Sequence, residues 1–179
     1  MAVRPIVLYP DPILKQLCRP VDLSWPGLSE VIDDLVDTLR AGPGVGVAAP
    51  QIGFDLRLFV VDVTPKNPGH GLLVLLNPQL VAGEGRVIGR EGCLSIPDYT
   101  ASVERFSRVV VKGLDPSGQM RLIESEGFEA ICLQHELDHL DGILFLDRVA
   151  CLKTDVFRRK GFKPRFEAKS YPKSPGETP

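Results

Sequence analysis

The segment GFEAICLQHELDHLDG, residues 127–142, contains two of the three histidines of the chain, His135 and His139. The spacing predicts a helix that Gly142 ends. Residues i and i+4 of a helix project from the same face, so the imidazoles of His135 and His139 converge on one point. This is the spacing of two ligands to a metal ion. Glu136 lies on the flank between them, where it can act as a general base instead of a ligand.

A catalytic metal centre needs a third protein ligand and one open position. No histidine follows the helix, and Glu167 and Glu177 lie in a weakly patterned C-terminal segment. Upstream, the best candidate is Cys93 in EGCLS, where Gly92 lets the backbone approach closely. A thiolate beside two imidazoles is a reasonable tetrahedral set for a divalent metal. Taken alone, Cys93 would more often be structural.

A third segment, GVGVAAPQ at 44–51, is dominated by small residues and exposes backbone to a partner at close range. It is not a phosphate-binding loop, because no Lys-Ser/Thr follows and the G-x-G-x-x-G pattern is absent. Gln51 supplies its only side-chain amide, which could face a developing oxyanion. The alternative is a tight helix-to-strand connection that simply needs glycine.

The remaining pattern predicts an α+β fold and not alternating βαβ units. An amphipathic helix is expected at 28–40, strands at 57–63, 71–78 and 79–89, a hairpin at 101–114 and 119–126, and a third helix at about 147–160. Residues 1–26 are expected to be irregular. We expect one domain over 1–160 and a partly flexible tail over 161–179.

Composition excludes several classes of protein. The chain has 179 residues, 44% hydrophobic and 25% charged, which is globular and not disordered. The net charge of −2 argues against binding nucleic acid by bulk charge, and no apolar run approaches a membrane span. The N-terminus lacks a signal or transit pattern, which favours an intracellular protein. The cysteines other than Cys93 (Cys18, Cys132 and Cys151) are read as small buried hydrophobes.

GVGVAAPQ, EGCLS and QHELDH resemble, in this order and at similar separations, the three signature motifs of bacterial peptide deformylases. YPDPIL at 9–14 and LDGILFLDR at 140–148 extend the likeness to about residues 3–150. The resemblance implies antiparallel β-sheets wrapped around a central metal-binding helix. It also implies removal of the formyl group from formyl-methionine of newly synthesised polypeptides, with release of formate.

The resemblance assigns roles to individual residues. It implies that Cys93, His135 and His139 hold one divalent metal ion and that Glu136 is the general base. The ion would be Fe²⁺ in the cell, with Zn²⁺, Ni²⁺ or Co²⁺ as purified alternatives. The oxyanion would be stabilised by the amide of Gln51 and the backbone N–H of Leu94, while Val45 and Gly46 would lend backbone to the bound peptide.

Other site residues follow from helical spacing. Phe128, Ile131 and Cys132 precede His135 by one or two turns and could line an apolar pocket for the methionine side chain, together with Val45. The alternative is that they are ordinary core residues.

Further predictions concern Asp138, His70 and the rim of the cleft. A buried Asp138 would need a partner, for which Arg105 is the candidate and Arg108 the alternative. His70 is expected to face solvent without a role. Many bacterial relatives carry a basic residue shortly after LSIP, where PDYTAS at 97–102 offers none.

Two other functions compete. A zinc peptidase cleaving internal peptide bonds would need a third ligand downstream. A binding module with a structural metal would need four protein ligands, with Cys132 as the candidate fourth. We expect a bacterial cytoplasmic enzyme of N-terminal methionine processing. Its partners would be N-formyl-methionyl nascent peptides and, transiently, the ribosome, without direct nucleic-acid readout or membrane contact.

Overall fold

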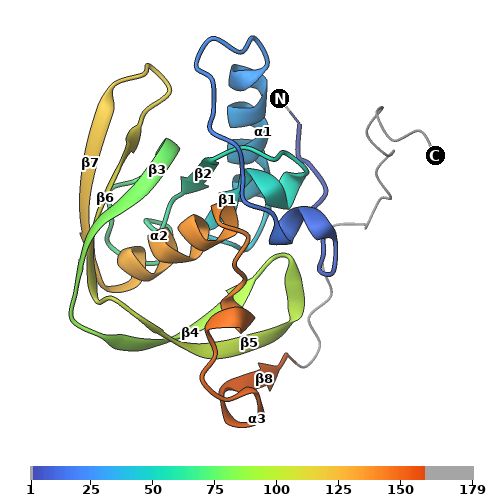
Figure 1. Cartoon of the computed structure of the whole chain (residues 1–179), viewed down its shortest axis with the longest axis vertical. Helices are drawn as coiled ribbons and strands as arrows, with labels where there is room; N and C mark the ends of the chain where they lie inside the picture. The colour runs from blue at the N-terminus through green and yellow to red at the C-terminus, as the bar shows by residue number, and fades with distance from the viewer. Residues whose placement is uncertain (1, 160–179) are drawn as a thin grey trace.

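A computed structural model describes residues 2–159. Within that range the chain forms eight strands, three α-helices and three short 3₁₀ helices (Figure 1). The helices are α1 (Leu28–Ala41), α2 (Gly127–Leu140) and α3 (Leu152–Asp155), with 3₁₀ turns at Pro12–Lys15, Ala49–Ile52 and Phe145–Arg148. The strands are β1 (Gly46–Ala48), β2 (Leu58–Val61), β3 (Leu73–Glu84), β4 (Val87–Cys93), β5 (Ile96–Arg105), β6 (Arg108–Leu114), β7 (Met120–Glu126) and β8 (Val156–Arg158).

The strands form two antiparallel sheets, as expected of an α+β fold. The larger sheet has the order β1-β2-β3-β6-β7, and the smaller has the order β4-β5-β8. Figure 1 shows α2 between the larger sheet and the ribbon formed by β4 and β5. The helix that carries the two histidines is therefore enclosed by sheets, which agrees with the expected architecture.

At β2, the larger sheet is covered on both faces. Successive residues of a strand point to opposite faces. Phe59 and Val61 face α2, where they join a core with Leu133 and Leu137. Leu58 and Val60 face α1 and belong to a second core that contains Leu35 and Leu39. All four β2 residues are fully buried, which explains why this strand is continuously apolar.

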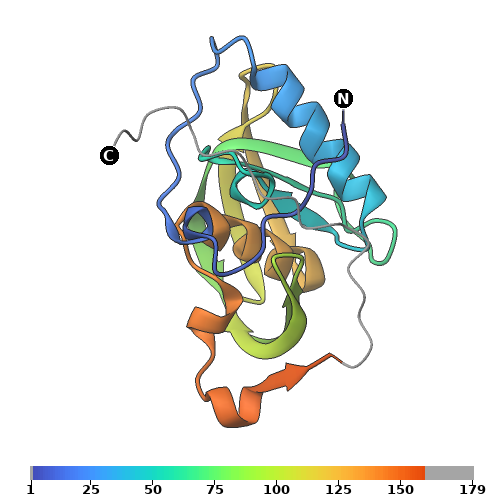
Figure 2. The same cartoon turned by 90° about the vertical axis from the view of Figure 1, so that its right-hand side faces the viewer.

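The helix α1 confirms the predicted amphipathic segment at 28–40, extended by one residue. Its apolar positions Val31, Leu35 and Leu39 are buried against β1 and β2, while Glu30 and Asp33 face outward. Figure 2 shows α1 lying obliquely across the outer side of the sheet. The helix α2 has no such exposed polar face, because most of its residues are buried.

Two strand predictions were wrong in their boundaries. Residues 71–78 and 79–89 do not form separate short strands: Leu73–Glu84 is one strand, with register shifts in its pairing to β6. These β-bulges bend a strand without ending it. The hairpin around 115–118 is confirmed for β6 and β7, but residues 101–105 belong to β5 and pair with β4 in the other sheet.

The third helix predicted over 147–160 is also wrong. After a 3₁₀ turn and the four residues of α3, Val156–Arg158 forms a strand that pairs with β5. A β-branched and an aromatic residue, Val156 and Phe157, favour this pairing over a helix. The predicted tail at 161–179 lies outside the described residues.

Burial of the cysteines agrees with the sequence reading in part. Cys18 and Cys132 are buried, as small hydrophobes are expected to be, but Cys151 is exposed at the N-terminus of α3. None of the described helices combines the length and the apolar character needed to cross a membrane.

Candidate active site

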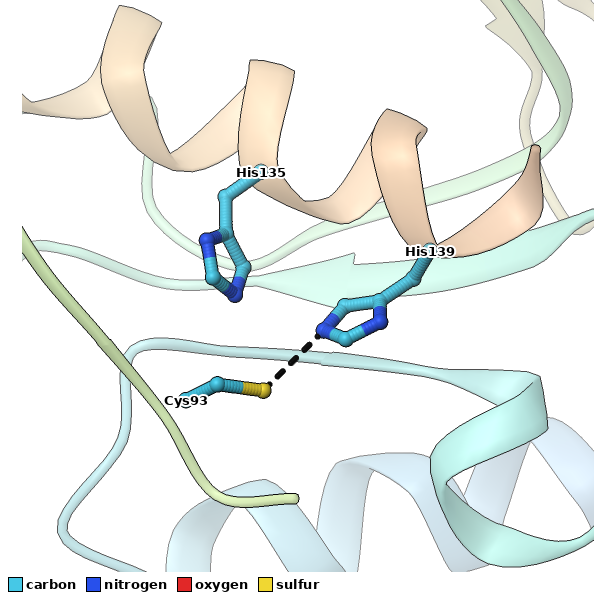
Figure 3. Close-up of side chains that lie close together, drawn as sticks. All are labelled: Cys93, His135 and His139. Carbon is cyan, nitrogen blue, oxygen red and sulfur yellow. Dashed lines mark hydrogen bonds between the residues drawn. The ribbon is translucent and has the colours of Figure 1, made fainter. Parts of the chain in front are cut away.

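The helix α2 brings His135 and His139 to one side of its axis, as their spacing predicts. Their ring centroids are 5.0 Å apart and the ring planes are nearly perpendicular. Figure 3 shows both rings reaching from the helix towards the thiol of Cys93. His139 is almost fully buried, whereas His135 keeps a small exposed fraction. The two rings therefore converge at the floor of an opening and not in a sealed core.

Cys93 reaches the histidines because it is the last residue of β4. The pairing of β4 with β5 shifts register between Gly92 and Cys93, and such a bulge redirects a side chain. The Cys93 Sγ lies 3.2 Å from His139 Nε2. One ligand atom from each of Cys93, His135 and His139 lies within 4.8 Å of the others. One sulfur and two nitrogen donors at this separation suit a tetrahedral divalent metal with its fourth position open.

The charges at this cluster also suit a metal. Burial alone would raise the pKa of the Cys93 thiol, but the adjacent imidazoles of His139 and His135 hold that pKa well below its ordinary value. The thiolate is the form of cysteine that binds metals. The site residues thus fit a metal ion both in donor type and in ionisation.

Glu136 lies beside this cluster and carries a perturbed carboxyl group. The side chain is buried, and the cost of burying its charge raises its pKa to about 7. Within residues 2–159, its Oε2 has no hydrogen-bond partner. A carboxylate with a pKa near neutral pH and an unused acceptor atom can accept and return a proton.

Gly46 is packed directly against this carboxylate. A Cβ built on Gly46 would lie 2.4 Å from Glu136 Oε1 and 2.8 Å from its Cδ. The glycine at this position is therefore required by the close approach of β1 to the carboxyl group. The contact with Glu136 therefore explains why residue 46, within the segment at 44–51, is a glycine.

Gln51, in the 3₁₀ turn after β1, is oriented from both ends of its amide. Its Oε1 accepts a hydrogen bond from the Ala48 N–H at 2.9 Å. Its Nε2 donates to Cys93 Sγ and Ser95 Oγ, each at 3.2 Å. The amide that the sequence singled out therefore lies at the cluster, next to the sulfur.

A cavity of about 290 Å³ opens over these groups. All the residues expected to contact the peptide or its oxyanion contribute to its wall: Val45, Gly46, Gln51, Leu94, Phe128, Ile131 and Cys132. The apolar members lie on α2, on the loop before β1 and, for Leu94, directly after β4. The structure thus brings together every site residue that the sequence singled out.

A buried ion network supports the cluster from behind, and the sequence analysis found only part of it. The Nδ1 of His135 lies 2.8 Å from Glu91 Oε2, and Arg105 donates two hydrogen bonds to the same carboxylate at 2.7 and 3.0 Å. Arg105 also contacts Asp138 at 2.6 Å, and Arg148 binds Asp138 through two nitrogens. A carboxylate on the second nitrogen of a metal-binding histidine fixes its tautomer and orientation.

Arg105 is thus confirmed as a partner of Asp138, whereas Arg108 pairs with Glu126 on the surface. Glu91 was missed, although its place two residues before Cys93 was a usable signal. The contacts of Glu91 change its ionisation. Burial alone would raise the pKa of Glu91, but the hydrogen bonds from His135 and Arg105 outweigh burial and lower this pKa to about 2.

The sequence predicted that His70 would face solvent without a role, but this exposed residue contacts Glu129. Its Nδ1 lies 2.6 Å from Glu129 Oε2, and its backbone N–H donates to the other oxygen of the same carboxylate. Glu129 belongs to the first turn of α2, so this contact ties the loop before β3 to the helix of the site.

Comparison with known proteins agrees with this geometry. The family model described as polypeptide deformylase matches residues 3–155. A peptide deformylase of Syntrophobacter fumaroxidans is 45% identical over 94% of this chain and 99% of its own length. One from Thermodesulfovibrio yellowstonii is 43% identical over 89% of this chain and 97% of its own.

Solved structures show the same likeness. A peptide deformylase from Legionella pneumophila superposes with a TM-score of 0.79 at 41% identity, covering 85% of this chain and 89% of that one. A Met-Ala-Ser-bound deformylase from Acinetobacter baumannii superposes with a TM-score of 0.78 at 36% identity, over 83% of this chain and 99% of that one. With the match extending over nearly all the described residues, the chain belongs to the polypeptide deformylase family.

Proposed function

We propose that the chain catalyses the reaction for which its relatives are named. It removes the formyl group from the N-terminal formyl-methionine of newly synthesised polypeptides and releases formate. The observation that carries this proposal is the convergence of Cys93, His135 and His139 beside the buried carboxyl of Glu136, inside a cavity that opens to solvent.

Cys93, His135 and His139 would hold the metal ion. When bound there, a divalent ion lowers the pKa of a water molecule and polarises a carbonyl group. One thiolate and two imidazoles suit Fe²⁺, Zn²⁺, Ni²⁺ and Co²⁺. We assign Fe²⁺ to the protein in the cell, with the other ions as substitutes in purified protein.

Glu136 moves the proton. Its carboxylate takes a proton from the attacking water and later delivers it to the amine that leaves as the new N-terminus. A pKa of about 7 suits both steps, because the group must be a base in the first and an acid in the second. The free Oε2 atom is the acceptor.

Gln51 and Leu94 stabilise the charge that develops on the formyl oxygen. The Gln51 Nε2 donates to Cys93 Sγ, and Leu94 follows Cys93 directly in the chain, which supports these two groups as the donors. Loss of one such donor costs a factor of about 10²–10³ in rate.

The peptide backbone binds along β1. Because β1 is an edge strand of the larger sheet, an extended peptide can add to it at Val45 and Gly46. The methionine side chain enters the apolar part of the cavity between Phe128, Ile131 and Cys132. The Met-Ala-Ser found in the Acinetobacter relative is the product expected from a formylated tripeptide.

The competing functions have less support. Nothing in the comparisons favours a peptidase that cleaves internal bonds. Cys132 lines the cavity, but the cluster of donors in the described residues contains only Cys93, His135 and His139. We place the enzyme in the bacterial cytoplasm, in transient contact with the ribosome, with residues 1–160 as its catalytic domain. The family match at 3–155 supports that domain boundary.

Three peptides test the function. Metal-loaded protein, purified without oxygen, is given formyl-Met-Ala-Ser, acetyl-Met-Ala-Ser and a longer unformylated peptide. The expected result is formate release from the first, little cleavage of the second and none of the third. Cleavage of internal bonds in the third, without formate release from the first, would replace the proposal with the peptidase.

A further inference from the structure

In the wall of the cavity, the acidic side chains are buried and the basic side chains lie nearer to the solvent. Two acids of its wall, Glu91 and Glu136, are buried, with 6% and 4% of their surface exposed. The cations of its wall lie further out: Lys66 and Arg90 are exposed, and Arg159 is half-buried. Glu91 is also neutralised by the buried Arg105. A peptide entering the cavity therefore first meets positive charge.

Arg159 is brought to this mouth by the strand that the sequence analysis did not predict. The strand β8 pairs with β5, and the backbone N–H of Arg159 donates to the Asp98 carbonyl at 2.7 Å. The guanidinium then lies over Gly92: a Cβ built there would be 2.3 Å from its Nη2 and 3.1 Å from its Cζ. Gly92 directly precedes Cys93, and Arg159 lines the same cavity as both of them.

The other two cations are held in place as well. Arg90 donates to Thr100 Oγ1 at 2.9 Å, and its guanidinium lies 3.4 Å from the centre of the Phe157 ring. Phe157 belongs to β8, so the same strand that brings Arg159 also supports Arg90. Across the mouth, the Lys66 ammonium donates to the Pro43 carbonyl at 2.5 Å. Cations that are already oriented lose less conformational entropy when they bind an anion.

We propose that Arg159, with Arg90 and Lys66, makes the enzyme favour formyl-methionyl peptides that carry an acidic side chain at the second or third residue. The inference rests on the proposed function, because it assumes that formyl-methionine occupies the cluster. An extended peptide advances by about 3.3 Å per residue. Because these cations line the outer wall of the cavity that contains Cys93, the residues that follow methionine are the ones within their reach.

The test uses matched peptides with amidated C-termini, so that the side chain carries the only variable charge. The first set is formyl-Met-Ala-Glu, formyl-Met-Ala-Gln and formyl-Met-Ala-Lys amides, and a second set places the same residues after methionine. Exposed ion pairs are weak, so we expect kcat/KM for glutamate to exceed that for glutamine by about 2- to 5-fold at low salt, with lysine lowest. The ratio should shrink in ~1 M salt, where the screening length is about 3 Å.

R159Q is compared with R158Q, which removes the same charge from the neighbouring residue. Arg158 is exposed and takes no part in the cavity wall. We expect R159Q to bring the glutamate-to-glutamine ratio close to one. R158Q should leave both the ratio and the activity unchanged. Because the ratio is taken within each protein, a general loss of activity in R159Q cancels.

Two outcomes would overturn the inference: a glutamate-to-glutamine ratio near one in the unaltered enzyme, or an equal fall of the ratio in R158Q and R159Q. Calorimetric affinities for the deformylated products, Met-Ala-Glu and Met-Ala-Gln amides, give the same comparison without turnover. A charge preference in binding with no formate release from any peptide would support the cationic mouth and contradict the proposed function. Formate release with no charge preference would support the proposed function and contradict the cationic mouth.

Discussion

Replacement of Gly46 by alanine should damage the enzyme through Glu136. A Cβ at residue 46 would lie 2.4, 2.8 and 2.9 Å from the Oε1, Cδ and Cγ atoms of Glu136. Carbon–oxygen contacts are ordinarily no shorter than about 3.3 Å. The carboxyl oxygen must therefore move by about 0.9 Å, and because three atoms of the side chain are too close, rotation of the carboxylate alone does not relieve the contact.

A displacement of this size is costly for a group that transfers a proton. A misplacement of about 1 Å can lower the rate about 10²-fold. We therefore expect kcat/KM for formate release from formyl-Met-Ala-Ser to fall by about that factor, which corresponds to about 2.7 kcal/mol. The metal ligands are not displaced, so the bound metal should remain near one ion per chain.

The control is Gly113→Ala, in β6, where the atoms nearest to the added Cβ, from the Leu76 carbonyl and the Leu75 side chain, lie 3.3–3.4 Å away. This variant makes the same chemical change at a buried glycine outside the cavity wall, and its activity should stay within about twofold of the unaltered enzyme, because it displaces no group of the site.

The double variant decides how Gly46→Ala acts. If it acts by displacing the base, Gly46→Ala should have little further effect in the Glu136→Ala background, because coupled residues are not additive. Full activity of Gly46→Ala would refute the reasoning from the contact. Additive losses in the double variant would instead mean that Gly46 contributes to peptide binding independently of Glu136.

Three further predictions concern the support of the site. Arg105→Met leaves Glu91 and Asp138 buried without this partner and should lower the free energy of unfolding by about 3 kcal/mol or more, measured by urea denaturation. In metal-free protein, Glu91→Gln should lower the free energy of unfolding by about 3 kcal/mol, because the lowered pKa of Glu91 means that the folded state binds fewer protons than the unfolded state. The difference in unfolding free energy between the variant and the unaltered chain should be full above pH 4.5 and should disappear as the pH falls towards 2. An unchanged difference at pH 2–3 would contradict this prediction. In Co²⁺-loaded protein, the sulfur-to-metal charge-transfer band should vanish in Cys93→Ala and persist unchanged in Cys132→Ala, whereas a band that remains in Cys93→Ala would indicate a second thiolate ligand and revive the closed structural site.

The helix of the site was predictable because its spacing alone fixes geometry. His135 and His139 share a face in any helix, and the structure adds only the direction in which that face points. The position of Cys93 required more. Its approach depends on a register shift at the end of β4, and nothing local in EGCLS specifies that shift. The likeness of three ordered motifs supplied what local reasoning could not.

Long-range pairing accounts for what the sequence did not predict. The strand β8 exists because Val156 and Phe157 find an open edge on β5, and the residues at 147–160 contain no signal of that edge. The assignment of 101–105 to one hairpin failed for a similar reason, since β5 turns away to pair with β4. Glu91 was overlooked because its partner on α2 is distant in sequence, although metal-binding histidines commonly bond such a carboxylate.

The central claim is that Glu136 moves the proton at the metal centre of Cys93, His135 and His139. The most direct test is formate release from formyl-Met-Ala-Ser by metal-loaded protein prepared without oxygen, compared with Glu136→Ala and Glu136→Gln of equal metal content. General acid–base catalysis contributes about 10²–10⁴-fold, so both variants should lose at least 10²-fold in kcat while they keep the metal. Equal rates in the unaltered protein and in both variants would contradict the account, because the reaction would then proceed without the carboxylate.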